Sequence, residues 1–210
     1  MPISVNHDER RATVIAVASS LIAKESLESV SVRDIADAAG CSTAIVSHYF
    51  RNKRELLLLT YNASIETATE RANDSLAAAK GHPKAYLAEI MPLDDKRWTE
   101  WRIWIQFWAR AAADPEIAAV QRDCVRRTRG NIQAILEAEK ERGRIAAQVD
   151  CEATARRLLT SIMGMAIQAV YDRKDWSAQA QHKLIDEELA RIYGGAATLR
   201  RGRTRQVAAE

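Results

Sequence analysis

The side chains best suited to chemistry in this chain are small and polar, and they lie together near position 45. Val46 and Phe50 are apolar and four residues apart, so they mark the inward face of a short helix. The opposite face carries small or hydrogen-bonding groups, namely Thr43, Ala44, Ser47 and His48. Side chains of this kind can meet base edges in the major groove of double-stranded DNA. The pattern therefore predicts nucleic-acid recognition.

Two short helices joined by a glycine turn would hold these residues in place. In the first helix, apolar residues recur at i, i+3, i+4 and i+7, at Val32, Ile35, Ala36 and Ala39. Ser31 can cap this helix, with Asp34 as the acid of a capping box. Gly40 tolerates the positive φ that often follows a helix end, and Ser42 can cap the second helix. This is the helix-turn-helix pattern.

Flanking helices are predicted on both sides of this pair. Residues 8–24 carry an apolar stripe that would brace the pair and complete a three-helix headpiece, after a loose arm formed by residues 1–7. A longer helix is predicted over residues 53–79. Because free N–H groups and the Lys53 cation meet at its start, this helix end can hold a phosphate.

The same stretch resembles one family. Ile35-Ala36, Ala39-Gly40, Ser42, His48-Tyr49-Phe50 and Lys53 resemble the helix-turn-helix of TetR-type transcriptional regulators. The string over residues 42–53 is especially similar to the branch of the choline-responsive repressor BetI. Two positions depart from the usual pattern, Cys41 where valine is common and Ala44 where glycine is common. The specific motif covers residues 31–53, and Ala44 bears on the operator sequence rather than on the fold.

The resemblance implies an all-α fold with an N-terminal three-helix helix-turn-helix domain over residues 1–53 and a helical effector-binding and dimerisation domain over residues 54–194. It implies a homodimeric repressor that a small-molecule effector releases from its operator. By matching position, phosphate contacts are expected from Ser31, Arg33, Ser42, His48, Tyr49 and Lys53. Base-edge contacts are expected from Thr43, Ala44, Ile45 and Ser47.

Composition agrees with an ordinary helical protein. The 210 residues are 47% hydrophobic and 28% charged, and 8 Gly and 4 Pro leave long stretches free of helix breakers. The net charge is only +3, so DNA binding must rest on local charge placement. Further helices are predicted near residues 84–91, 97–112, 116–141, 151–171 and 177–193. Residues 195–210 are Arg-rich and are predicted to form a disordered tail.

Aromatic residues gather in one predicted helix. The set with helical spacing is Trp98, Trp101, Trp104, Phe107 and Trp108. This stripe is either hydrophobic core or the wall of an effector pocket, and both interpretations stay open. Indole faces attract quaternary ammonium groups, so an apolar or cationic effector is the class that a pocket here would favour.

Two predicted helices, residues 151–171 and 177–193, are candidates for a dimer interface. The first is apolar over more of its circumference than one contact face requires, with Met163 and Ala166 among its apolar residues. In the resembling family, two such helices from each protomer form a four-helix interface. The alternative is a core within one chain.

Other classes of function lack support. His7, His48, His82 and His182 are scattered, with no metal-binding, phosphate-loop or nucleophile motif, so no enzyme, metal or cofactor is predicted. Glu137, Glu139 and Glu141 are expected on a solvated helix surface. Cys41, Cys124 and Cys151 show no disulfide or metal spacing, and no apolar run is long enough to cross a membrane. Both features favour the reducing cytoplasm. A thiol sensor at Cys124 is a minor alternative for that residue. A rival function is a helical ligand-binding or scaffold protein without specific DNA binding.

Overall fold

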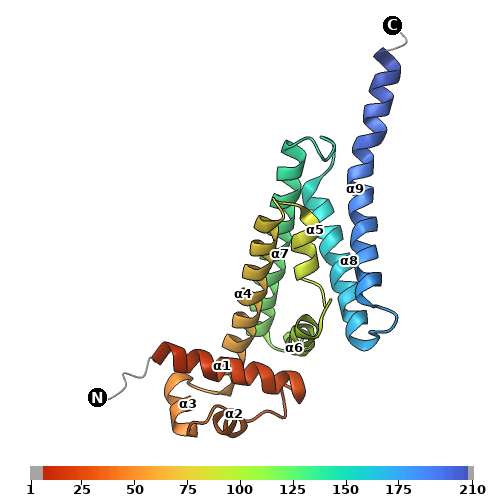
Figure 1. The fold of residues 1–210 in the computed structure, drawn as a ribbon. Helices are drawn as coiled ribbons and strands as arrows, with labels where there is room; N and C mark the ends of the chain where they lie inside the picture. Colours follow the sequence, from red (N-terminus) through yellow and green to blue (C-terminus); the bar gives the residue numbers. More distant parts are fainter. Residues whose placement is uncertain (1–6, 208–210) are drawn as a thin grey trace. The chain divides into compact units, whose positions relative to one another are not determined.

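The computed structural model describes the backbone of residues 7–207 and the side chains of residues 7–194. The described chain contains α-helices and no strand (Figure 1). In chain order they are α1 (His7–Lys24), α2 (Val32–Ala38), α3 (Thr43–Tyr49), α4 (Lys53–Ala78), α5 (Pro83–Glu89), α6 (Asp95–Ala111), α7 (Pro115–Glu141), α8 (Cys151–Tyr171) and α9 (Ala178–Val207). The all-α prediction is confirmed, and the predicted helices are present.

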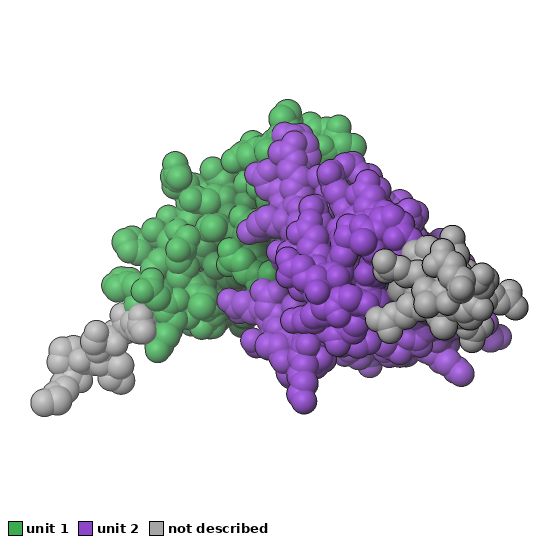
Figure 2. All heavy atoms as spheres, turned by 90° about the horizontal axis from the view of Figure 1, so that it is seen from above, with its two compact units in different colours: residues 1–69, 99–121 green, residues 70–98, 122–210 purple. Residues whose placement is uncertain are grey.

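The chain divides into two compact units, coloured in Figure 2. Unit 1 comprises residues 1–69 and 99–121, and unit 2 comprises residues 70–98 and 122–210. Helices α4, α6 and α7 each contribute one part to unit 1 and the rest to unit 2. The compact units do not divide at residue 53, since unit 1 includes α4 up to residue 69 together with the headpiece. The functional division at residue 53 stays a prediction.

In unit 1, α1 braces the helix-turn-helix as predicted. Val14, Ala18 and Ile22 on its inward face are at most 1% exposed. The Arg11 guanidinium lies 5.8 Å from the ring centroid of Phe50, just after α3. These contacts help to hold the headpiece together, and Figure 1 shows α1 lying across α2 and α3.

The loop between α1 and α2 is tied to α6 within the same unit. The Gln106 side chain accepts a hydrogen bond from the Leu27 backbone N–H at 2.6 Å and donates one to the Ile22 carbonyl at 3.3 Å. A single amide therefore satisfies backbone groups at the end of α1 and in the loop that follows it.

Unit 2 contains a buried carboxylate that the sequence placed on a solvated surface. Glu139, near the end of α7, is 0% exposed. Its carboxylate accepts hydrogen bonds from Arg142 at 3.0 Å, Arg144 at 2.6 Å and the Tyr193 hydroxyl of α9 at 2.9 Å. The prediction was wrong for Glu139, because residues distant in sequence supply the donors that make its burial tolerable. Glu137 and Glu141 are exposed, as predicted.

Two further predictions need correction or restriction. A disordered tail was predicted from residue 195, but helix α9 continues to Val207. Ala, Leu, Arg and Gln, which are good helix formers, make up most of residues 195–207, and no proline interrupts this segment. Residues 208–210, and residues 1–6 of the predicted arm, lie outside the described residues, while His7 is the first residue of α1.

Within α8, Ala166 is 0% exposed and packs inside unit 2, whereas Met163 is half-buried. Ala166 is thus a core residue of the single chain rather than part of a free face.

Candidate nucleic-acid interface

The predicted recognition helix presents its small polar face to solvent. Val46 is 1% exposed and points into unit 1, and Phe50, which follows α3, is 2% exposed. The residues on the other face are exposed or half-exposed, namely Ser42, Thr43, Ala44, Ile45, Ser47 and His48. Ser42 caps α3 by accepting a hydrogen bond from the Ile45 N–H at 3.3 Å. The cap and the spacing of Val46 and Phe50 are local features, and the burial of these two residues in unit 1 turns the polar face toward solvent.

The turn before α3 has the geometry that the sequence predicted. Gly40 adopts φ of +64°, a left-handed conformation that favours glycine. The capping box of α2 is complete, since Ser31 Oγ accepts from the Asp34 N–H at 3.2 Å and the Ser31 N–H donates to the Asp34 carboxylate at 2.8 Å. Hydrogen bonds from the Ser31 hydroxyl and backbone lower the pKa of Asp34. The Ser31 hydroxyl, a predicted phosphate ligand, is therefore engaged in the cap.

Tyr49, at the end of α3, has a partner that the motif did not indicate. Its hydroxyl lies 2.9 Å from His7 Nδ1, and the ring centroids of His7 and His48 are 6.2 Å apart. The start of α1 thus adds an imidazole beside two predicted phosphate contacts. The spacing of about 40 residues between His7 and Tyr49 gave no local signal of this contact.

Lys53 and Arg33 are arranged differently. Lys53 is half-buried as a residue, and its ammonium donates to the Glu28 backbone carbonyl at 3.2 Å. Arg33 is exposed and pairs with Asp37 at 3.8 Å. Arg51, which was not among the predicted residues, has an 89% exposed side chain and a 3.5 Å pair with Glu55. Exposed pairs of this kind are weak, so Arg33 and Arg51 are available cations beside α3.

Comparison with known proteins bears directly on this helix-turn-helix. A family model described as "Bacterial regulatory proteins, tetR family" matches residues 14–59, and one described as "BetI-type transcriptional repressor, C-terminal" matches residues 83–194. The chain belongs to the TetR family. Members of this TetR family are transcriptional regulators rather than enzymes, with a DNA-binding helix-turn-helix and a ligand-binding domain.

Individual relatives of this TetR-family protein agree. The transcriptional regulator PksA of Bacillus subtilis is 27% identical over 176 residues, covering 82% of this chain and 84% of PksA. BetI of Cronobacter sakazakii is 26% identical over 199 residues, covering 90% and 93%. A regulator from Saccharomonospora viridis, solved in complex with choline, has a TM-score of 0.78 at 23% identity and covers 86% of this chain and 95% of its own. At that identity the likeness shows the fold alone.

The aromatic stripe of the TetR-family chain is packed rather than open. In unit 1, Trp101, Trp104 and Phe107 are 3%, 6% and 0% exposed, and Trp108 is half-buried. The Trp104 and Trp108 indoles donate to Ser64 and to the Tyr61 hydroxyl, both at 3.0 Å, so their N–H groups are satisfied. These contacts support the core interpretation; the effector role of these residues stays a prediction.

Trp98 belongs to unit 2, where the Arg173 guanidinium lies 4.9 Å from its ring centroid. A cation already covers this indole face within the chain.

The cysteines and the potential metal ligands of the described residues bear on the remaining expectations from the sequence. Burial raises the pKa of the Cys124 thiol, which argues against the thiol-sensor alternative. Among the described residues, no group of three or more His, Cys, Asp or Glu side chains is placed to hold a metal ion. No helix in the described part of the chain is long and apolar enough to span a membrane.

Proposed function

We propose that the protein is a homodimeric transcriptional repressor, and that a small-molecule effector releases it from operator DNA. The observation that carries this proposal is the capped α3, which presents Thr43, Ala44 and Ser47 to solvent while Val46 anchors it in unit 1. A helix of this kind can enter the major groove and meet base edges. We propose that such a regulator works in the cytoplasm, in contact with the DNA that it regulates.

Dimerisation would place two such helices on one operator. Two headpieces can dock together when their recognition helices are about 34–36 Å apart, one turn of B-DNA. We propose that α8 and α9 supply the interface. On α8, Thr160, Gly164 and Gln168 are exposed at four-residue spacing and form a continuous outer face with small residues. Small residues allow a partner helix to approach closely.

The effector class is the finer part of the proposal. Choline is bound in the Saccharomonospora regulator, and the BetI-type family model covers the C-terminal part of this chain. A compact cation with apolar groups is therefore the class we propose. Because α4 belongs to both units, a displacement of its later part would change the position of the headpiece at its start. Release from the operator then requires that the effector bind the displaced state more tightly.

Genome-wide mapping of the sites bound by the protein tests the repressor function directly. We expect binding at a small set of near-palindromic sites. Transcription of the genes next to these sites should rise when the gene for this protein is deleted. A protein that enriches no DNA, and whose deletion changes no transcript, would instead be a ligand-binding or scaffold protein.

Replacing Lys53 with alanine is expected to weaken binding to all DNA about equally. If Lys53 neutralises one phosphate, the slope of log affinity against log salt becomes shallower by about one unit. Mobility-shift titrations over a range of salt concentrations measure this slope. Lys174→Ala, an exposed lysine after α8, is the control and should leave the slope unchanged. A slope that stays the same in Lys53→Ala removes this residue from the interface.

Replacing Ser47 with alanine is expected to change operator preference rather than overall affinity. A contact with a base contributes about 1–3 kcal/mol to discrimination at one base pair. Because Ser47 is exposed, its replacement should not affect folding. Competition between the operator and its single-base variants measures the effect. Equal losses on operator and random DNA would reassign Ser47 to backbone contacts.

A further inference from the structure

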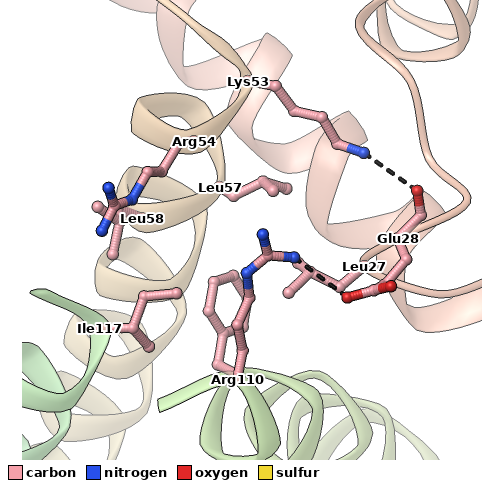
Figure 3. A pocket seen from close by; sticks show the side chains of 9 residues that line it. Leu27, Glu28, Lys53, Arg54, Leu57, Leu58, Arg110 and Ile117 are labelled. Atoms are coloured by element: carbon pink, nitrogen blue, oxygen red, sulfur yellow. Dashed lines mark hydrogen bonds and ion pairs between the residues drawn. The ribbon is translucent and has the colours of Figure 1, made fainter. Parts of the chain in front are cut away.

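Unit 1 contains a cavity of about 310 Å³ that is lined by both apolar and charged side chains (Figure 3). Its apolar lining residues include Leu57, Leu58 and Ile117, contributed by α4 and α7. Its charged lining residues are Lys53, Arg54, Arg110 and Glu28. Figure 3 shows Arg54 beside Leu58, whereas Lys53 and Arg110 are near Glu28. The volume lies at the lower end of the range for small-molecule pockets. Two cations that can exchange their partners, close to apolar side chains, suit a small amphipathic anion.

The cations are not equally available to such an anion. Arg54 is held by two carboxylates, Asp114 at 2.5 Å and Glu116 at 2.9 Å. Arg110 pairs with Glu28 at 3.1 Å, but these side chains are 46% and 80% exposed. An exposed pair of this kind is easily exchanged.

Lys53 is the second available cation. Its ammonium donates to the Glu28 carbonyl at 3.2 Å, which is a neutral acceptor. Figure 3 shows Lys53 and Arg110 both directed toward Glu28, one from the start of α4 and the other from the end of α6. A carboxylate placed between them would accept from both, with charge-assisted hydrogen bonds that are stronger than a bond to a carbonyl.

We propose that this cavity binds a small amphipathic carboxylate, which displaces the Glu28 side chain from Arg110, and that its occupancy weakens operator binding. The effect on DNA rests on the proposed function, in which Lys53 contacts a phosphate. A ligand carboxylate on Lys53 competes for the same charge. Displacement of the Glu28 side chain also removes the Arg110 ion pair from the loop between α1 and α2, which precedes the helix-turn-helix. The site is separate from the aromatic stripe except for Phe107, which lines the cavity.

Octanoate is the probe, and calorimetric titration in the absence of DNA measures its binding. We expect saturable binding that Arg110→Gln weakens at least tenfold, because the principal cation is lost. Glu28→Gln should strengthen binding several-fold, because the competing carboxylate is removed while the backbone carbonyl remains. Arg126→Gln, an exposed arginine of α7, is the matched control and should have no effect. These opposite signs cannot arise from a general loss of folding.

Two results would overturn the site. Equal octanoate affinity in the native chain, Arg110→Gln and Glu28→Gln would show that the cations take no part. Equal affinity for octylammonium, which has the same chain and the opposite charge, would show a purely apolar site.

The coupling to DNA is tested by operator titration with and without saturating octanoate. We expect octanoate to lower operator affinity in the native chain and to have little effect in Arg110→Gln. Saturating operator should lower octanoate affinity by the same factor. Octanoate binding with unchanged operator affinity would overturn the coupling. A protein that binds octanoate as described but binds no operator would instead overturn the proposed function and leave the site intact.

Discussion

Replacing Gly164 with arginine is expected to convert the proposed dimer into a monomer and to lower operator affinity by about 10²- to 10⁴-fold. Gly164 is exposed on the outer face of α8, between Thr160 and Gln168. A Cβ at this position would meet no atom within 4 Å beyond its chain neighbours and the backbone of its own helix, so we expect the protomer to stay folded. A long cationic side chain would nevertheless occupy the space into which the partner helix is proposed to pack.

The loss of DNA affinity follows from the loss of effective concentration. In a dimer, the first headpiece to dock holds the second close to its half-site, and a monomer loses this advantage. Sedimentation velocity measures the association state, and mobility shift measures operator affinity. Because Gly164 is remote in sequence from the recognition helix, the variant should keep the same preference among operator sequences while its overall affinity falls.

Gly130→Arg is a matched control for this experiment. Gly130 lies on α7, is exposed, and likewise has no described atom within 4 Å of an added Cβ. The same change in size, charge and helix propensity should therefore leave both dimerisation and operator affinity unaltered. A Gly164→Arg protein that still sediments as a dimer of native affinity would place the interface elsewhere than on the outer face of α8.

Replacing Glu139 with glutamine is expected to reduce the free energy of unfolding by about 1.5–3 kcal/mol, the range for hydrogen bonds to charged groups. The carboxylate is buried and accepts from Arg142, Arg144 and Tyr193, and this network joins the end of α7 to α9. The two arginine side chains are 48% and 50% exposed, so water can solvate them after the change and limit the loss. Urea denaturation measures the difference.

Glu137→Gln, an exposed glutamate on the same helix, is the control and should change stability little. If Glu137→Gln and Glu139→Gln have the same stability, the buried network contributes nothing measurable. Because α9 belongs to the proposed dimer interface, the Glu139→Gln protein should also dimerise less tightly.

Acid should remove the contribution of Glu139. Although burial opposes ionisation, hydrogen bonds from Tyr193, Arg144 and Arg142 hold the pKa of Glu139 below its ordinary value. A carboxyl group with a lowered pKa in the folded state stabilises the fold fully above its unfolded pKa of about 4.3, and loses this effect as pH falls through the folded pKa. The stability difference between the native chain and Glu139→Gln should therefore be constant near pH 7 and shrink in this acidic range.

Local sequence was sufficient to predict the helix-turn-helix. Ser31, Asp34, Gly40 and Ser42 act on backbone groups within four residues, so their caps and turn could be predicted without knowledge of the fold. The exposed face of α3 followed from the same local periodicity, because Val46 and Phe50 had to point inward. The family resemblance rested on these residues, and the matched family models confirm it.

The tertiary structure decided which of the remaining groups are buried, paired or open. Glu139 is indistinguishable from Glu137 in sequence, and its burial depends on Tyr193, 54 residues away. From sequence alone, Ala166 could belong to the core or to a dimer interface, and the tryptophans of α6 could belong to the core or to a pocket. An apolar helix face is compatible with each of these. The cavity between Lys53, Glu28 and Arg110 joins three segments with no common spacing. Local patterns determine helices and caps because hydrogen bonds at short range set them, whereas burial depends on which distant surfaces pack together.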